Sequence, residues 1–107
     1  MIDDVKFSPS PVTTATTITG RFHVRETQTG KSVTDALVYS IALPYSRVTV
    51  PGEVKTDANG WATAQFNPAK LFPRKGYVTV FVRARKPGDD VLSGVSTRRL
   101  AQFVVNR

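Results

Sequence analysis

The stretch Tyr77-Val78-Thr79-Val80-Phe81-Val82-Arg83-Ala84-Arg85 alternates strictly between two kinds of side chain. Val78, Val80, Val82 and Ala84 fall on one face of an extended chain, and the other residues fall on the opposite face. Because successive side chains of a β-strand point to opposite faces, this pattern predicts a strand with one buried side and one partly exposed side. The stretch therefore predicts a β-sheet with one face against the core.

The same period-two pattern recurs along the chain, separated by Gly, Pro, Asn and Asp residues that are typical of turns. It predicts further strands over residues 5–7, 17–25, 36–43, 61–66 and 94–105. Pro9 and Pro11 are expected to end the first strand or to move the chain to the edge of the other sheet. In the last strand, the row that contains Phe103 and the row that contains Leu100 both fit a core face.

One further strand is expected to be interrupted. Residues 48–50 and 53–56 carry strand-forming side chains on either side of Pro51-Gly52. The following Asn59-Gly60 tolerates the positive φ of a tight turn, so this strand is expected to form a hairpin with residues 61–66.

Helical periodicity is almost absent, and the one candidate, residues 68–72, allows a single turn. About seven short strands without crossover helices predict an all-β fold, an antiparallel Greek-key sandwich. The 107 residues suit a single domain. The short length and the abrupt start indicate that residues 1–107 are one domain of a larger multidomain chain.

Composition excludes several classes of function. The chain has no Cys, which excludes a disulfide framework, a Cys-ligated zinc site, an iron–sulfur cluster and a thiol nucleophile. No apolar run approaches the roughly 18 residues of a transmembrane helix, so membrane insertion is not expected. Met1 is followed by Ile2-Asp3-Asp4 rather than by a basic region and an apolar core. An exported parent protein would therefore carry its signal outside this chain.

A short motif lies between the interrupted strand and its expected partner. Thr56, Asp57, Gly60 and Ala62 have the spacing Thr-Asp-x-x-Gly-x-Ala within residues 54–66. This segment resembles a hairpin of bacterial immunoglobulin-like domains, which occur as tandem repeats in invasin- and intimin-type surface proteins. The resemblance implies an immunoglobulin-like β-sandwich that serves as a non-enzymatic spacer or adhesion module. Because one fold hosts many functions, the functional part of this expectation is an analogy.

No constellation of residues typical of an enzyme is present, and no cofactor is expected. Gly30-Lys31-Ser32 ends like a phosphate-binding loop, but Arg25 stands where that motif needs Gly. His23, the one histidine, falls on the polar side of its strand, where an exposed surface histidine is expected. The acidic pairs Asp3-Asp4 and Asp89-Asp90 leave calcium binding open, since calcium prefers oxygen ligands, although neither pair forms a dense acidic loop.

Residues 36–43 are apolar on both faces. If the smaller side chains face the core, the outward row of this strand lies beside the outward row of residues 77–85. The candidate interaction face then consists of Leu37, Tyr39, Ile41, Tyr77 and Phe81. Exposed apolar patches mark contact surfaces. The alternatives are that the strand has the opposite register, or that the loops around Tyr45 and Phe72 cover the patch.

The formal net charge of +7 permits binding to an anionic partner and is also typical of a solvated surface. A candidate basic cluster on the last two strands consists of Arg83, Arg85, Arg98 and Arg99. Arg21 and Arg25 are expected on the other sheet, so the charge is divided between two faces and nucleic-acid binding is not favoured. Trp61 is expected to face outward there, either as a platform for sugars or beneath a neighbouring loop.

These observations predict a non-enzymatic structural or binding module, monomeric in isolation, of a secreted or cell-surface bacterial protein. Its partners would be the neighbouring domains of the parent chain and a protein or polysaccharide ligand. One alternative is an accessory carbohydrate- or polymer-binding domain of a secreted enzyme, in which Trp61, Tyr77 and Phe81 stack on sugars. The other alternative is a basic nucleic-acid-binding domain.

Overall fold

The computed structural model describes residues 1–26, 29–43, 47–49, 52–70, 72–85 and 97–107. Within these ranges the regular elements are eight β-strands, without an α-helix. Accordingly, the described residues contain no helix of the length and apolarity that a membrane crossing requires. The predicted all-β class is confirmed.

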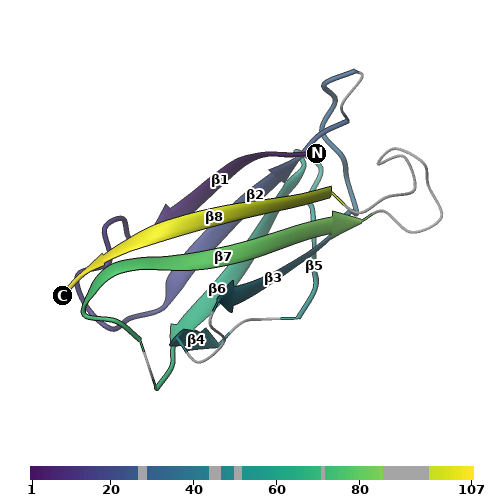
Figure 1. Ribbon diagram of the computed structural model, residues 1–107. Coiled ribbons are helices and arrows are strands. Elements are labelled where there is room, and N and C mark those ends of the chain that lie inside the picture. The colour runs from purple at the N-terminus through teal and green to yellow at the C-terminus, as the bar shows by residue number, and fades with distance from the viewer. Residues whose placement is uncertain (27–28, 44–46, 50–51, 71, 86–96) are drawn as a thin grey trace.

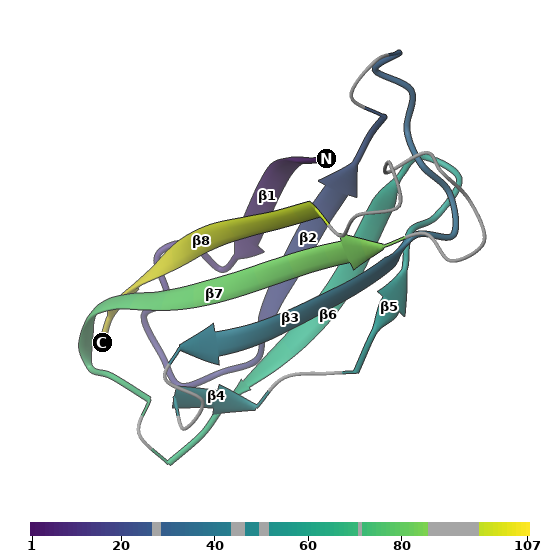
Figure 2. The same ribbon diagram turned by 45° about the vertical axis from the view of Figure 1, so that its right-hand side comes forward.

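Two antiparallel four-stranded sheets pack against each other as a sandwich (Figure 1). The first sheet has the order β1-β2-β6-β4 and the second the order β5-β3-β7-β8 (Figure 2). The strands are β1 (Ile2–Ser8), β2 (Ile18–Val24), β3 (Leu37–Leu43), β4 (Val48–Thr49), β5 (Val54–Lys55), β6 (Trp61–Pro68), β7 (Lys75–Arg85) and β8 (Thr97–Asn106). The sandwich is therefore confirmed, with eight strands instead of about seven.

The core lies between the alternate rows that the sequence indicates. The four apolar residues of β7 that share one face are fully buried: Val78, Val80, Val82 and Ala84. In β8 the row of Phe103 and Val105 is buried, which settles the face that the sequence leaves open. Phe103 contacts Phe7 of the first sheet, with 5.2 Å between the ring centroids. These rings join the two sheets through the apolar interior.

The expected hairpin between residues 53–56 and β6 is wrong. Residues 48–49 pair with β6 in the first sheet, whereas residues 54–55 pair with β3 in the second. The side chain of Thr56 explains the crossing, because its buried hydroxyl donates to the carbonyl of Val33 at 2.6 Å and accepts from the amide of Ala36 at 2.9 Å. These bonds hold the chain on the segment that leads into β3.

The chain also moves to the other sheet directly after β1. Past Pro9 and Pro11, Val12 forms a parallel bridge with Val105 of β8. The amide of Val12 donates to the carbonyl of Val104 at 2.8 Å, and the amide of Asn106 donates to the carbonyl of Val12 at 2.8 Å. The structure shows both effects expected of these prolines, because β1 ends at Ser8 and the chain then moves to the edge of the other sheet.

The sandwich is elongated, with extents of 42 × 20 × 18 Å. Its two chain ends lie at opposite ends of the long direction (Figure 1). β1 begins at one end, and β8 finishes at the other.

Candidate functional site

The outward side of the second sheet carries large apolar side chains in register across three strands. Ile41 of β3 pairs with Phe81 of β7, and Phe81 pairs with Leu100 of β8. Leu100 is 64% exposed and Tyr77 is 59% exposed. We name this surface the outer face and define it by the outward side chains of β3, β7 and β8, namely Leu37, Tyr39, Ile41, Leu43, Tyr77, Thr79, Phe81, Arg83, Arg85, Arg98, Leu100, Gln102 and Val104.

All five residues of the predicted interaction face lie on the outer face. The alternative register of β3 is wrong, because Val38, Ser40 and Ala42 are the buried residues of that strand. Phe72 belongs to the core and does not cover the patch. Tyr45, the other residue proposed to cover it, lies outside the described residues.

Three apolar residues of the outer face were missed by sequence reasoning: Leu43, Leu100 and Val104. Both rows of β8 contain apolar residues, so the sequence pattern alone does not assign the exposed row. The burial of Phe103 between the sheets decides this assignment.

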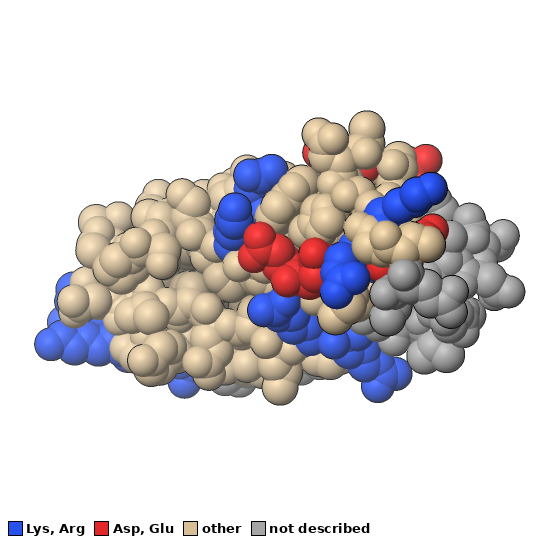
Figure 3. Space-filling view, turned by 90° about the horizontal axis from the view of Figure 1, so that it is seen from above, with Lys and Arg blue, Asp and Glu red and all other residues tan. Residues whose placement is uncertain are grey.

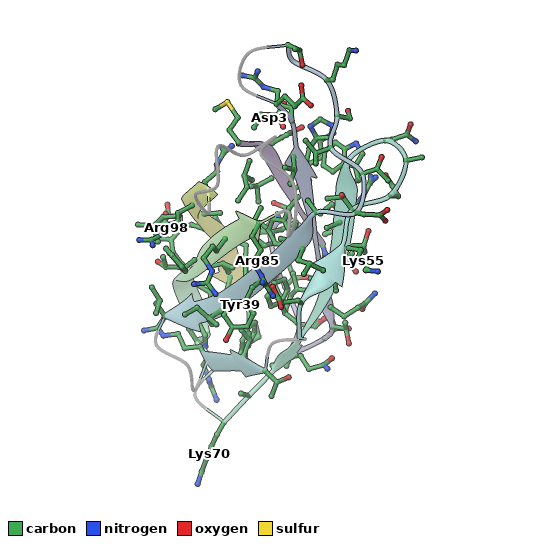
Figure 4. All side chains as sticks on the ribbon, turned by 90° about the vertical axis from the view of Figure 1, so that its right-hand side faces the viewer. Asp3, Tyr39, Lys55, Lys70, Arg85 and Arg98 are labelled. Atoms are coloured by element: carbon green, nitrogen blue, oxygen red, sulfur yellow. The ribbon has the colours of Figure 1, made fainter. Side chains whose placement is uncertain are left out.

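The predicted basic cluster is only partly brought together. Arg83 of β7 pairs with Arg98 of β8 on the outer face, and Arg85 lies further along β7 on the same side. Figure 4 shows Arg85 and Arg98 with Tyr39 on the strands of the second sheet. Arg99 points to the opposite side, where it donates to the carbonyl of Ile2 in β1 at 3.2 Å.

Arg85 is held by an acidic side chain. Its guanidinium donates to both carboxylate oxygens of Glu53, at 2.8 and 2.9 Å. These hydrogen bonds lower the pKa of Glu53 and raise the pKa of Arg85 from their ordinary values. Both side chains are exposed to solvent, so the pair adds little to folding stability and mainly removes Arg85 from the free positive charge of the outer face.

The first sheet holds a polar network around His23, which contradicts the expectation of an exposed histidine. The His23 side chain is only 15% exposed. Its Nδ1 donates to the carboxylate of Asp3 at 2.6 Å, and Asp3 also lies 3.4 Å from Arg25. A register shift between Ile2 and Asp4 makes Asp3 an additional residue of β1. Such a bulge redirects a side chain, and no pattern in this sequence marks it.

The other ring nitrogen of His23 faces two oxygens. Nε2 lies 2.9 Å from Oγ of Ser32 and 2.9 Å from the backbone oxygen of Asn59. Ser, His and Asp in this order resemble a nucleophilic triad. However, Nε2 lies as close to the backbone oxygen of Asn59 as to the hydroxyl of Ser32, so the ring is not directed at Ser32 alone. The network therefore joins β1, β2, the loop at Ser32 and the turn at Asn59.

Trp61 faces outward from the first sheet, as the sequence predicts, but its ring is half-buried. The guanidinium of Arg21 lies 4.7 Å and the ammonium of Lys6 lies 5.3 Å from a ring centroid of the indole. The ring of His23 lies 5.0 Å away. These contacts occupy surface that a stacked sugar would need.

The acidic pair Asp3-Asp4 lends no support to a calcium site. Asp3 is engaged by His23 and Arg25, and Asp4 pairs with Lys6. Among the described residues, acidic and histidine side chains do not gather in a group of three or more that could hold a metal ion. Asp89-Asp90 lies outside the described residues.

Positive charge is spread over the molecule. In the view of Figure 3, Lys and Arg side chains occupy several separate areas, with acidic side chains between some of them. Arg21 lies on β2 of the first sheet, whereas Arg83 and Arg98 lie on the second. This division matches the sequence expectation for the two sheets.

Comparison with known proteins identifies a solved structure with a similar fold. No family model matches the sequence, and no curated protein matches it. Among solved structures, the D00-D0 domain of intimin is similar, with a TM-score of 0.70 over 99% of this chain and a sequence identity of 14%. This chain covers 47% of that structure, which is about half of its length. The chain therefore has the immunoglobulin-like β-sandwich fold of this intimin domain, as the resemblance of residues 54–66 implies.

Proposed function

We propose that this chain is a non-enzymatic structural and binding module of a secreted or cell-surface bacterial protein, and that it holds neighbouring domains at a fixed spacing. The observation that carries the proposal is the position of the chain ends, at opposite ends of a body 42 Å long (Figure 1). The likeness in fold to an intimin domain supports it.

The connections near the chain ends suit a module under tension. The segment at Val12 runs parallel to β8 and is joined to it by two backbone hydrogen bonds. A force that separates residue 1 from residue 107 pulls this segment and β8 in opposite directions along their axes. The two bonds are then loaded together, in shear, instead of being opened one after the other.

The network at His23 supports a module without catalysis. Its histidine contacts the backbone oxygen of Asn59 and its aspartate lies 3.4 Å from Arg25, so these side chains connect segments of the sheet. Sugar binding has less support, because Lys6 and Arg21 occupy the ring of Trp61. Nucleic-acid binding has less support too, because the basic side chains are divided between the sheets.

Force spectroscopy on tandem copies of the chain tests the spacer role. Each copy is expected to unfold in one cooperative step. The step lengthens the molecule by roughly 340 Å, which is the length of 107 extended residues at about 3.6 Å each less the folded length of 42 Å. Val12→Pro removes the amide that donates to Val104 and is expected to lower the unfolding force. Ala15→Pro, in an exposed segment nearby, serves as the control. Gradual extension without force peaks would contradict the proposal.

A further inference from the structure

The outer face places two arginines directly opposite each other. Arg83 of β7 and Arg98 of β8 are cross-strand partners. Like charges at such positions destabilise a sheet. A contribution to the stability of the sheet therefore does not explain why two arginines occupy these positions.

In the described part of the chain, no carboxylate lies within 4.0 Å of Arg83 or Arg98, although the charge of Arg83 contributes to the lowered pKa of Glu53. Glu53 is engaged by Arg85 through two hydrogen bonds. The guanidinium of Arg83 lies over the ring of Tyr39, 5.8 Å from its centroid. This contact orients Arg83 along the surface and leaves its charge available.

An apolar row borders the two arginines. Ile41, Phe81 and Leu100 are in register across β3, β7 and β8, and Phe81 and Arg83 are consecutive outward residues of β7. Leu100, next to Arg98 in the outward row of β8, is 64% exposed. The complementary surface is thus one that places carboxylates beside apolar side chains.

We propose that the outer face docks a protein segment that presents carboxylate groups beside apolar side chains. The carboxylates pair with Arg83 and Arg98, and the apolar side chains pack on Phe81 and Leu100. This inference rests on the proposed function, because it names the partner that the module would hold at its fixed spacing. The two are separable, since the spacer role depends on the chain ends and not on this face.

Charge complementarity favours such a segment over the other occupants. A second copy would bring its own Arg83 and Arg98 to the interface and carries the same net charge of +7. A nucleic acid or an anionic membrane would be attracted equally by Arg21 and Lys6 on the first sheet. Neither accounts for an apolar row placed beside one particular pair of cations.

The probe is the random copolymer of glutamate and tyrosine, which carries carboxylates and apolar rings on one peptide. Poly-L-glutamate supplies carboxylates alone, and heparin supplies a dense anion. Binding of each is measured by titration calorimetry, and the contacted residues are located by chemical-shift changes of backbone amides. The copolymer is expected to bind more tightly than poly-L-glutamate, with the shift changes confined to β3, β7 and β8.

Two adjacent arginines provide a matched pair of variants. Arg98→Gln and Leu100→Gln are expected to weaken copolymer binding by about threefold to tenfold each. Arg99→Gln removes the same charge on the opposite side of β8 and is expected to change binding by less than about twofold. Both arginine variants alter an exposed side chain, so folding is expected to be retained.

Several results would overturn the proposal. Equal binding of heparin, poly-L-glutamate and the copolymer, with shifts that include Lys6 and Arg21, would mean attraction by net charge only. Binding to phosphatidylglycerol vesicles but not to the copolymer would assign the face to lipid. Concentration-dependent dimerisation that Leu100→Gln abolishes would assign it to a second copy. A normal force profile combined with absent copolymer binding would reject the partner and leave the spacer role intact.

Discussion

The carboxylate of Asp3 lies 2.6 Å from Nδ1 of His23, and this contact ties the first strand to the second at one end of the sandwich. Asp3 occupies the bulged position of β1, next to Arg25. On the opposite side of the ring, Nε2 reaches the carbonyl of Asn59 in the turn before β6. One largely buried imidazole on β2 therefore links this strand to β1 and to the turn before β6.

A double-mutant cycle measures this link. Asp3→Asn, His23→Gln and the double variant are compared by urea denaturation. The coupling free energy between the two sites is expected to be about 1 kcal/mol, because the residues share a charge-assisted hydrogen bond in a partly buried position. Strictly additive effects of the two substitutions would show that the contact does not contribute to stability.

Thr56→Val tests the crossing between sheets. The substitution removes the hydroxyl that donates to Val33 and accepts from Ala36, and leaves both backbone groups without this partner in a buried place. A loss of about 1–3 kcal/mol in the free energy of unfolding is expected. Thr63→Val, at an exposed position of β6, is the control and is expected to have a much smaller effect. Similar losses for both variants would contradict the role given to Thr56.

Gly20→Ala tests the packing of the phenylalanine rings. A Cβ at Gly20 would lie 2.7 Å from a ring carbon of Phe66 and 3.0 Å from one of Phe22. Because both rings are fully buried, they have little space to move, and a loss of about 1–3 kcal/mol is expected from thermal denaturation. Gly52→Ala, where a Cβ meets nothing within 4 Å, is the matched control. An unchanged melting temperature for Gly20→Ala would show that the rings of Phe66 and Phe22 can shift to accommodate the added methyl group.

The lowered pKa of Asp57 implies that the free energy of unfolding depends on pH. The amides of Trp61 and Asn59 donate to its carboxylate and hold its pKa below the ordinary value. A carboxyl group whose pKa is lower in the folded state stabilises the fold above its unfolded pKa of about 3.9. This stabilisation is lost as the pH falls through the lowered pKa.

The Asp57→Asn variant should therefore show a flatter decrease of the urea midpoint between about pH 5 and pH 2. Glu53→Gln removes another carboxylate of lowered pKa, and because the Glu53–Arg85 pair is exposed, the double variant should be only slightly flatter. Parallel curves for the wild type and Asp57→Asn would refute the contribution of Asp57.

Much of the fold follows from local pattern. The alternation in residues 77–85 correctly predicts which side of β7 is buried. For β3 the sequence leaves two registers open, and the structure shows the one that places Tyr39 and Ile41 outward. Pattern reasoning fails at residues 53–56, because a turn motif is compatible with pairing in either sheet. The outcome there depends on bonds between Thr56 and the distant residues Val33 and Ala36.

The same distinction between local pattern and long-range contacts applies to the candidate sites. Period-two alternation is a local property of the backbone, so the chain order of residues suffices to predict most of the strands and the core row of β7. Contacts between strands depend on register, bulges and exchange between sheets, which are set by packing of residues far apart in sequence. For this reason the pairing of Arg83 with Arg98, the exposure of Leu100 and the link from Asp3 to His23 emerge only in the folded sandwich.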